Sequence, residues 1–125
     1  MNMTVKAHVA TLQAAVDIHT AATGPHQSCE SITCSPTFQP YPVSLLRQSV
    51  AKGGNSQGLH LSDGPLVLVF LPNYWQKKSD NERVLAVMKA ALEEIREKAV
   101  ENDTASDFIY LNYAADFQDP IDCRT

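Results

Sequence analysis

The sequence predicts a small α+β domain in which helices pack on one face of a mostly antiparallel sheet. Three observations support this prediction. Two long segments carry apolar residues at helical spacing, one short segment is apolar throughout, and helical and strand-like segments alternate along the 125 residues. A chain of this length forms one domain and buries roughly two thirds of its unfolded surface. A purely parallel sheet with helices on both faces is the competing architecture.

The first third of the chain predicts a helix and then a strand. The helix covers residues 5–22 and ends at Gly24-Pro25. Its apolar stripe consists of Val5, Val9, Leu12, Val16 and His19. The strand covers residues 31–39, where apolar and polar side chains alternate. Pro36 cannot donate a backbone hydrogen bond, so it indicates an edge position or a bulge in this strand.

The middle of the chain predicts a short helix, a loop and a buried strand. Helical spacing of apolar residues favours a helix over residues 43–51, with Pro42 beside its first turn. Residues 53–58 are rich in glycine and are expected to form a tight connection. Residues 66–71 are apolar on both faces, so we expect both faces of this strand to be covered.

The last part of the chain predicts a long helix and a final strand. The helix covers residues 80–100, and its apolar stripe consists of Leu85, Met88, Leu92, Ile95 and Ala99. The final strand covers residues 108–113. Strand alternation places Tyr110 and Asn112 on one face and Tyr113 on the other.

The charge balance and the residue spacings argue against several classes of function. The net charge is -4, and no Lys or Arg cluster alternates with aromatic residues, so nucleic-acid binding is not expected. No apolar run is long enough to span a membrane, and the N-terminus lacks a signal-peptide pattern. A cytoplasmic location is therefore the default expectation. Neither the histidines nor the three cysteines have metal-site spacing, and we expect free thiols, with a Cys29–Cys34 disulfide as the alternative.

Three short motifs, in order along the chain, resemble one enzyme family. They are Thr37-Phe38-Gln39-Pro40-Tyr41-Pro42, then Gly53-Gly54-Asn55-Ser56-Gln57-Gly58-Leu59 before the apolar strand, and finally Tyr110-Leu111-Asn112-Tyr113-Ala114-Ala115 followed by Gln118-Asp119-Pro120-Ile121. Residues 28–122 thereby resemble the C-terminal half of the berberine-bridge-enzyme-like FAD-linked oxidases. Many fungal oxidases of secondary metabolism have a similar stretch.

The resemblance implies an FAD-linked oxidoreductase that oxidises a small organic substrate by hydride transfer to the flavin. In that family, one domain binds FAD and a second domain, an antiparallel sheet with helices, covers the flavin ring and shapes the substrate site. Residues 1–125 resemble only part of the second domain. The residues that would bind the pyrophosphate or attach the flavin have no counterpart here, so the FAD-binding domain is expected to be absent and the chain alone to be inactive.

Four residues are the site candidates that follow from this resemblance. Tyr110 is the candidate catalytic residue, because a tyrosine whose pKa is lowered by a neighbouring charge or hydrogen bond can remove a proton as a hydride leaves. Asn112 offers a donor and an acceptor for the edge of a flavin, and Tyr113 is a second candidate for contact with the cofactor. Gln39 ends a predicted strand and is the candidate for substrate contact. In each case, a side chain that only covers the sheet or solvates a turn is the simpler alternative.

Two other functions stay open at this point. The domain could be a non-catalytic binding protein or a dimer, in which a second copy covers the apolar strand at 66–71. It could also be the inactive product of a truncated gene. The partners expected under these hypotheses are a small-molecule substrate, a second copy of the chain or a separate flavin-binding chain.

Overall fold

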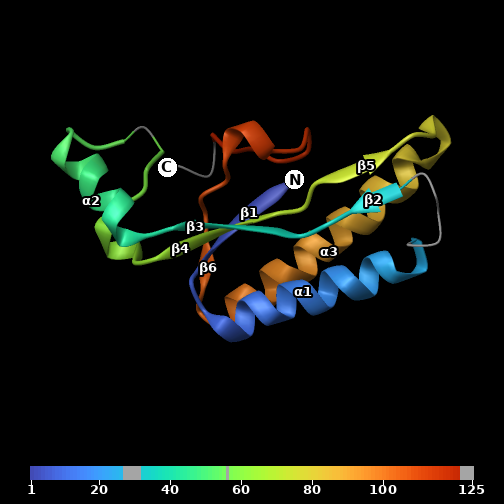
Figure 1. The fold of residues 1–125 in the computed structure, drawn as a ribbon, viewed down its shortest axis with the longest axis horizontal. Helices are drawn as coiled ribbons and strands as arrows, with labels where there is room; N and C mark the ends of the chain where they lie inside the picture. The colour runs from blue at the N-terminus through green and yellow to red at the C-terminus, as the bar shows by residue number, and fades with distance from the viewer. Residues whose placement is uncertain (27–31, 56, 122–125) are drawn as a thin grey trace.

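The computed structural model describes residues 1–26, 32–55 and 57–121, and its elements alternate between helix and strand (Figure 1). The strands are β1 (Asn2–Lys6), β2 (Ile32–Cys34), β3 (Thr37–Tyr41), β4 (Leu66–Phe70), β5 (Asn73–Trp75) and β6 (Ala105–Ser106). The α-helices are α1 (Val9–Thr23), α2 (Val43–Ala51) and α3 (Asn81–Glu101). The predicted α+β class is therefore confirmed.

The central layer is a four-stranded sheet with the order β3-β4-β1-β6, in which every neighbouring pair is antiparallel. A second, two-stranded sheet pairs β2 with β5. Prolines separate the two sheets, because Pro36 stands between β2 and β3 and Pro72 between β4 and β5. Pro lacks the N–H that a continuous ladder needs. Because the strands of both sheets pair antiparallel, the competing, purely parallel architecture is wrong.

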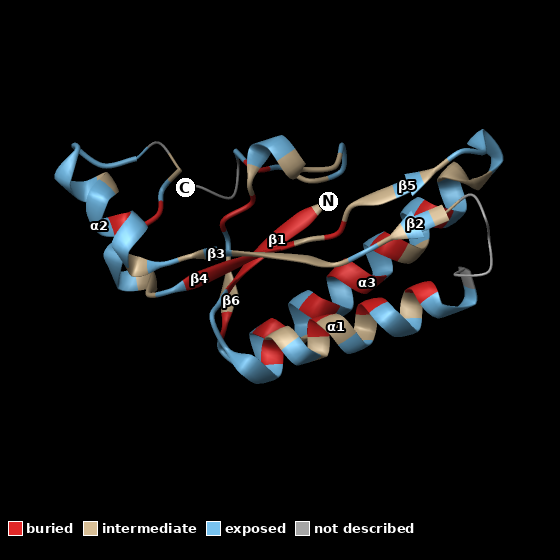
Figure 2. Ribbon diagram, in the orientation of Figure 1, coloured by how far each residue is buried: buried red, intermediate tan, exposed pale blue. Residues whose placement is uncertain are grey.

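The helices α1 and α3 lie side by side against one face of this sheet, as Figure 1 shows. The core between them consists of Met3, Val5, Ala15, Val67, Val69, Leu71, Leu92, Ile95 and Ala99. Cross-strand neighbours share a face, so Met3 opposite Val69 and Val5 opposite Val67 both point toward the helices. Figure 2 shows the buried residues concentrated along β1, β4 and the facing sides of the two helices.

The opposite face of the sheet has no α1 or α3 above it, and we call it the helix-free face. The segment after β6 crosses it, and α2 with the loop that follows lies at its far end (Figure 1). A second cluster of buried residues lies on this side and joins α2, the loop after it, β4 and the segment after β6; its members are Leu46, Leu59, Leu66 and Phe108. Both faces of β4 are covered as predicted, since Leu66, Leu68 and Val69 are all buried.

The structure corrects the predicted N-terminal helix. The chain begins with β1, and α1 starts only at Val9, because Val5 satisfies a strand as well as a helical stripe. The buried side of α1 consists of Thr11, Ala15, His19 and Thr23. Val9, which belonged to the predicted stripe, is 84% exposed. The polar, fully buried Asn2 and Thr4 conceal β1 in the sequence, since buried strands are usually apolar.

Three further predictions need smaller corrections or none. The strand expected at 31–39 is two strands in different sheets, broken at Pro36. The helix expected at 43–51 is found with those bounds, and the long helix is shifted by one residue to Asn81–Glu101. On α3 the exposed Leu85 is not part of the buried stripe, and Val84 takes its place.

Candidate functional site

The helix-free face brings the predicted site residues to one side of the sheet. On β3, Gln39 lies opposite Leu68 of β4, and Leu68 lies opposite Thr4 of β1, so these three side chains share this face. Tyr41 follows two positions after Gln39 and therefore points the same way, about 6.6 Å further along the strand. Phe70 shares the face near the other end of β4.

Two side chains, the buried Asn2 and the half-buried Gln118, hold the segment after β6 against this face. The Asn2 amide donates to the carbonyl oxygen of Tyr110 at 3.1 Å, and its own oxygen accepts the Tyr110 N–H at 2.9 Å. Gln118 donates to the Asn2 carbonyl oxygen at 2.7 Å and accepts the N–H groups of Asn2 and Ala115. These bonds replace a strand ladder, because they satisfy backbone groups through side chains.

The residues 108–113 do not form the predicted strand. They run in extended and irregular conformation into a single 3₁₀ turn, Leu111–Tyr113, with Tyr110 at its start. Side chains three residues apart lie one above the other in a 3₁₀ turn. Tyr110 and Tyr113 therefore come to the same side, in an edge contact with ring centroids 5.1 Å apart, and the predicted placement of Tyr113 on the opposite face is wrong.

Aromatic rings cover much of the helix-free face. The Tyr113 ring stacks on Phe70 with a centroid distance of 4.1 Å and an interplanar angle of 15°. At the other end, the Tyr41 and Phe108 rings meet edge to face at 6.1 Å. Gln39 stands on β3 between these two aromatic contacts. We call the set Gln39, Tyr41, Phe70, Tyr110, Asn112 and Tyr113 the aromatic face.

The polar atoms of the aromatic face are arranged around the tyrosine hydroxyls. The Asn112 amide donates to the Tyr110 hydroxyl oxygen at 2.8 Å, which leaves the Tyr110 O–H free to act as a donor. Burial raises the pKa of Tyr41, and the neighbouring Tyr110 and Tyr113 raise it further. Tyr41 therefore keeps its proton at neutral pH and presents a hydroxyl donor.

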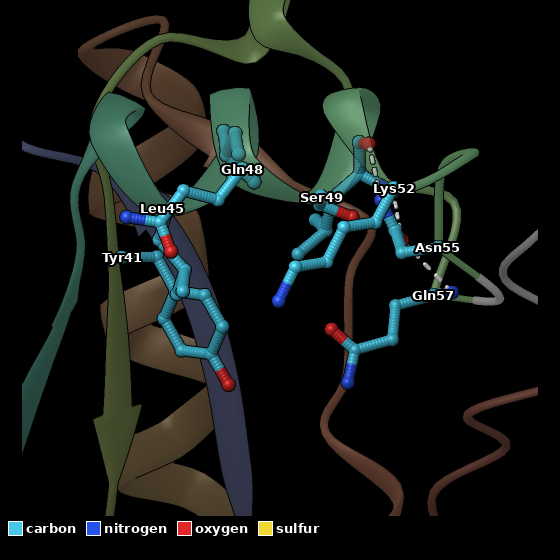
Figure 3. Close-up of a pocket in the computed structure, with 9 residues that line it drawn as sticks. Tyr41, Leu45, Gln48, Ser49, Lys52, Asn55 and Gln57 are labelled. Carbon is cyan, nitrogen blue, oxygen red and sulfur yellow. Dashed lines mark hydrogen bonds between the residues drawn. The ribbon is translucent and has the colours of Figure 1, made fainter.

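A cavity of about 270 Å³ opens beside Tyr41. Its walls come from β3, from α2 and from the glycine-rich loop, and its lining includes Leu46, Gln48, Lys52 and Gln57 (Figure 3). Sequence reasoning missed Tyr41 and these cavity residues. Tyr41 could have been found from strand alternation, since it stands two residues after Gln39, but the prolines at 40 and 42 obscured that strand.

The predictions on metal sites, membrane spans and thiols concern, in the structure, only the described part of the chain. Within it, no group of three His, Cys, Asp or Glu side chains is placed to hold a metal ion, and no helix is long and apolar enough to cross a membrane. Cys34 is a free thiol whose pKa is raised by burial. Cys29 and Cys123 lie outside the described residues, and so does the alternative disulfide.

Curated proteins with similar sequences point to flavin enzymes. The chain is 37% identical over 84 residues to the FAD-dependent monooxygenase FUP4 of Fusarium proliferatum, which is 67% of this chain and 16% of that protein. It is 39% identical over 85 residues to the FAD-dependent monooxygenase tpcD of Cochliobolus heterostrophus, again 16% of that protein. A third relative, the FAD-dependent monooxygenase drtC of Aspergillus calidoustus, is 34% identical over 84 residues.

The chain is thus similar to one part of several fungal proteins named FAD-dependent monooxygenases. It spans about a sixth of the length of these curated relatives. No family model matches the chain, and no solved structure matches it. The expected FAD cofactor agrees with the names of the relatives, whereas the finer resemblance to berberine-bridge enzymes is not decided by those names.

Proposed function

We propose that this chain is a substrate-side domain of an FAD-linked oxidoreductase, and that its aromatic face is directed at the flavin ring and the substrate. One observation carries the proposal: four residues selected from sequence, Gln39, Tyr110, Asn112 and Tyr113, belong to one helix-free face although they come from two distant segments. Polar and aromatic groups gathered on one side of a sheet, with no helix above them, can be presented together to a ligand.

The chemistry of this face suits a flat heteroaromatic cofactor. The rings of Tyr110 and Tyr113 offer surfaces for aromatic contact. The Asn112 side chain is exposed, and its carbonyl oxygen has no partner among the described residues, so it offers an acceptor to a ring N–H. We assign contact with the cofactor to Asn112 and Tyr113, and contact with the substrate to Gln39.

Bound FAD would supply the acceptor for a hydride. Tyr110 is the residue that we assign to the accompanying proton. Its hydroxyl oxygen already accepts the Asn112 amide N–H, which fixes the direction of its lone pairs and O–H. In its phenolate form, Tyr110 would take the proton from the carbon-bound hydroxyl or amine of a substrate in general base catalysis, and the Asn112 N–H would stabilise the phenolate oxygen. Tyr41 and Gln39 would orient the substrate beside it.

We further propose that the chain corresponds to the second domain of a berberine-bridge-like oxidase. The antiparallel sheet with its helices on one face agrees with that expectation. The FAD-binding part would then come from a separate segment or chain, and the 125 residues alone would not turn over substrate. A homodimer finds less support, because β4 is already covered on both faces by the chain itself.

A chimeric enzyme tests this proposal. The Cochliobolus relative would carry this chain in place of its matching segment, and its flavin content and the turnover of its own substrate would be measured. We expect the chimera to keep its flavin and part of its turnover. Tyr110→Phe should lower turnover by roughly 10²-fold or more at unchanged flavin content, since general base catalysis contributes about that much.

The matched control is Tyr74→Phe in the same chimera. Tyr74 lies on β5, outside the aromatic face, and is 70% exposed. This variant should turn over substrate as the chimera does. Equal turnover of the Tyr110→Phe and Tyr74→Phe variants would exclude a catalytic role for Tyr110.

A further inference from the structure

The cavity beside Tyr41 has the form of a preorganised binding site. Leu46 and Leu59, which are both buried, line its apolar floor, and Leu45 adds to its rim. Asn55 fixes the loop that closes one side: its amide donates to the Leu59 carbonyl oxygen, and its own oxygen accepts the N–H groups of Gln57 and Leu59. These bonds hold the loop beside α2 and so fix this wall of the cavity.

The loop conformation depends on glycine. Gly53, Gly54 and Gly58 all have φ between +71° and +99°, a region that residues with a Cβ rarely adopt. These turns bring Gln57 back toward α2, so that its side chain faces the same open space as Tyr41 (Figure 3). The glycine-rich motif therefore shapes a wall of the cavity.

Five polar groups line the cavity without a use inside the protein. They are the Tyr41 hydroxyl, the Gln48 amide, the Ser49 hydroxyl, the Lys52 ammonium and the Gln57 amide. Among the described residues, none of these side-chain groups makes a hydrogen bond or an ion pair. Polar side chains that converge on an apolar cavity, and that are not used by the fold, are the common composition of a small-molecule site.

The Lys52 ammonium is not needed to cap α2. The last carbonyl groups of that helix already accept backbone N–H groups: Ser49 accepts from Lys52 and Gly54, and Val50 accepts from Gly53. In Figure 3 the Lys52 side chain instead extends into the open space that Tyr41 and Gln57 also line. Its charge is therefore available to a ligand.

The charge of the lining selects the ligand class. Lys52 carries the only formal charge among the described residues that line the cavity, and no carboxylate stands there. Amide N–H groups and two hydroxyls surround it, and all of these can donate to an anion. The leucine floor requires an apolar body on the same molecule, and about 270 Å³ is at the lower end of the size of small-molecule pockets.

We propose that this cavity binds the carboxylate of a small acid with an apolar body, with Lys52 as the anchor for the charge and the leucines in contact with that body. Assigning that acid as the substrate rests on the proposed function, because Tyr41 joins the cavity to the aromatic face. The binding itself requires no flavin. The Tyr41 hydroxyl stays protonated at neutral pH and donates to the same carboxylate.

A titration of the 125-residue chain with benzoate tests the site. The readout is the NMR signals of the Gln48 and Gln57 side-chain amides. Benzamide, which has the same ring and no charge, is the matched probe. We expect benzoate to shift both amide signals with a millimolar Kd and to bind about tenfold more tightly than benzamide, since a charge-assisted hydrogen bond contributes about that factor. Added salt should weaken benzoate binding alone.

Two variants locate the effect. Lys52→Gln should reduce the affinity for benzoate to that for benzamide, while Lys77→Gln, at an exposed lysine outside the cavity, should leave it unchanged. The proposal is overturned if benzamide binds as well as benzoate or if Lys52→Gln leaves the affinity unchanged. Since the titration contains no flavin, its failure is distinguishable from loss of turnover in the chimeric enzyme, which tests the proposed function alone.

Discussion

The two faces of the four-stranded sheet are constructed from different interactions. The face under α1 and α3 is an apolar core in which residues from three elements, such as Val5, Val69 and Ile95, are all fully buried. The helix-free face is covered by an irregular segment that aromatic contacts and side-chain hydrogen bonds hold in place. Apolar burial on one face therefore stabilises the fold, and the groups that could bind or react with a ligand lie on the other face.

This difference has a consequence for dynamics. Apolar burial between regular elements opens only with global unfolding, whereas a segment held by a few hydrogen bonds opens locally at lower free energy. The helix-free face is thus the part of the molecule that can adjust to a ligand without loss of the core. Substitutions on the two faces should separate these properties.

The largest expected effect is on the helix-covered face. Ile95→Ala removes a side chain with no exposed surface and leaves a cavity against β1 and α1, so it should lower the free energy of unfolding by about 2–5 kcal/mol. Urea unfolding followed by circular dichroism measures it. The control is Val100→Ala on the same helix, where the side chain is 62% exposed and the change should stay within about 0.5 kcal/mol. Similar values for the two variants would contradict the assignment of the core.

The next effect concerns the attachment of the helix-free face. Asn2→Ala removes two hydrogen bonds to the Tyr110 backbone and leaves buried groups unpaired, which should cost about 1–3 kcal/mol of unfolding free energy. Amide hydrogen exchange at Tyr110 should accelerate more than exchange in α3. The control is Asn112→Ala, at an exposed residue of the same segment, which should leave exchange at the Tyr110 amide nearly unchanged. Uniform acceleration across both faces would argue against a locally held segment.

Sequence patterns predicted the regular elements better than the covering segment. The bounds of α2 and nearly those of α3 follow from local periodicity and a proline, and the apolar run of β4 is self-evident. The strand β1 was missed because Asn2 is buried for the sake of a partner 108 residues away. A single sequence does not display a bond of that separation.

Residue types in the sequence indicate the site candidates, but the predicted local geometry of the segment that carries three of them is wrong. Tyr110 and Tyr113 were expected on opposite faces of a strand, and the 3₁₀ turn puts them on the same side. Gln39 and Tyr41 stand on the same strand, but the sequence indicates only Gln39 as a candidate, because the prolines at 40 and 42 obscure the end of the strand that carries Tyr41. Lys52 carries no local signal, because its role depends on how the loop after α2 folds back.

A pH effect of intermediate size belongs to the helix-covered face. His19 is buried, its Nε2 has no partner in the described part of the chain, and desolvation lowers its pKa below 6.5. The unfolded chain therefore takes up this proton first as the pH falls below about 6.5, and stability decreases from there toward acid pH. His19→Phe should flatten this part of the profile of Tm against pH. An unchanged slope in the variant would exclude His19 as its source.

The smallest effect expected is at alkaline pH, and it reports on the helix-free face. Burial, and then the neighbouring Tyr110 and Tyr113, raise the pKa of Tyr41, so its contribution to stability is complete below pH 10, where unfolded tyrosine ionises, and is lost as the pH rises through its folded pKa. In a spectrophotometric titration of the four tyrosines, we expect one to ionise late. Tyr41→Phe should remove this late step and Tyr74→Phe should retain it. Loss of the late step in both variants would mean that the buried hydroxyl is not that of Tyr41, and that the cavity beside it is more open to water than its lining indicates.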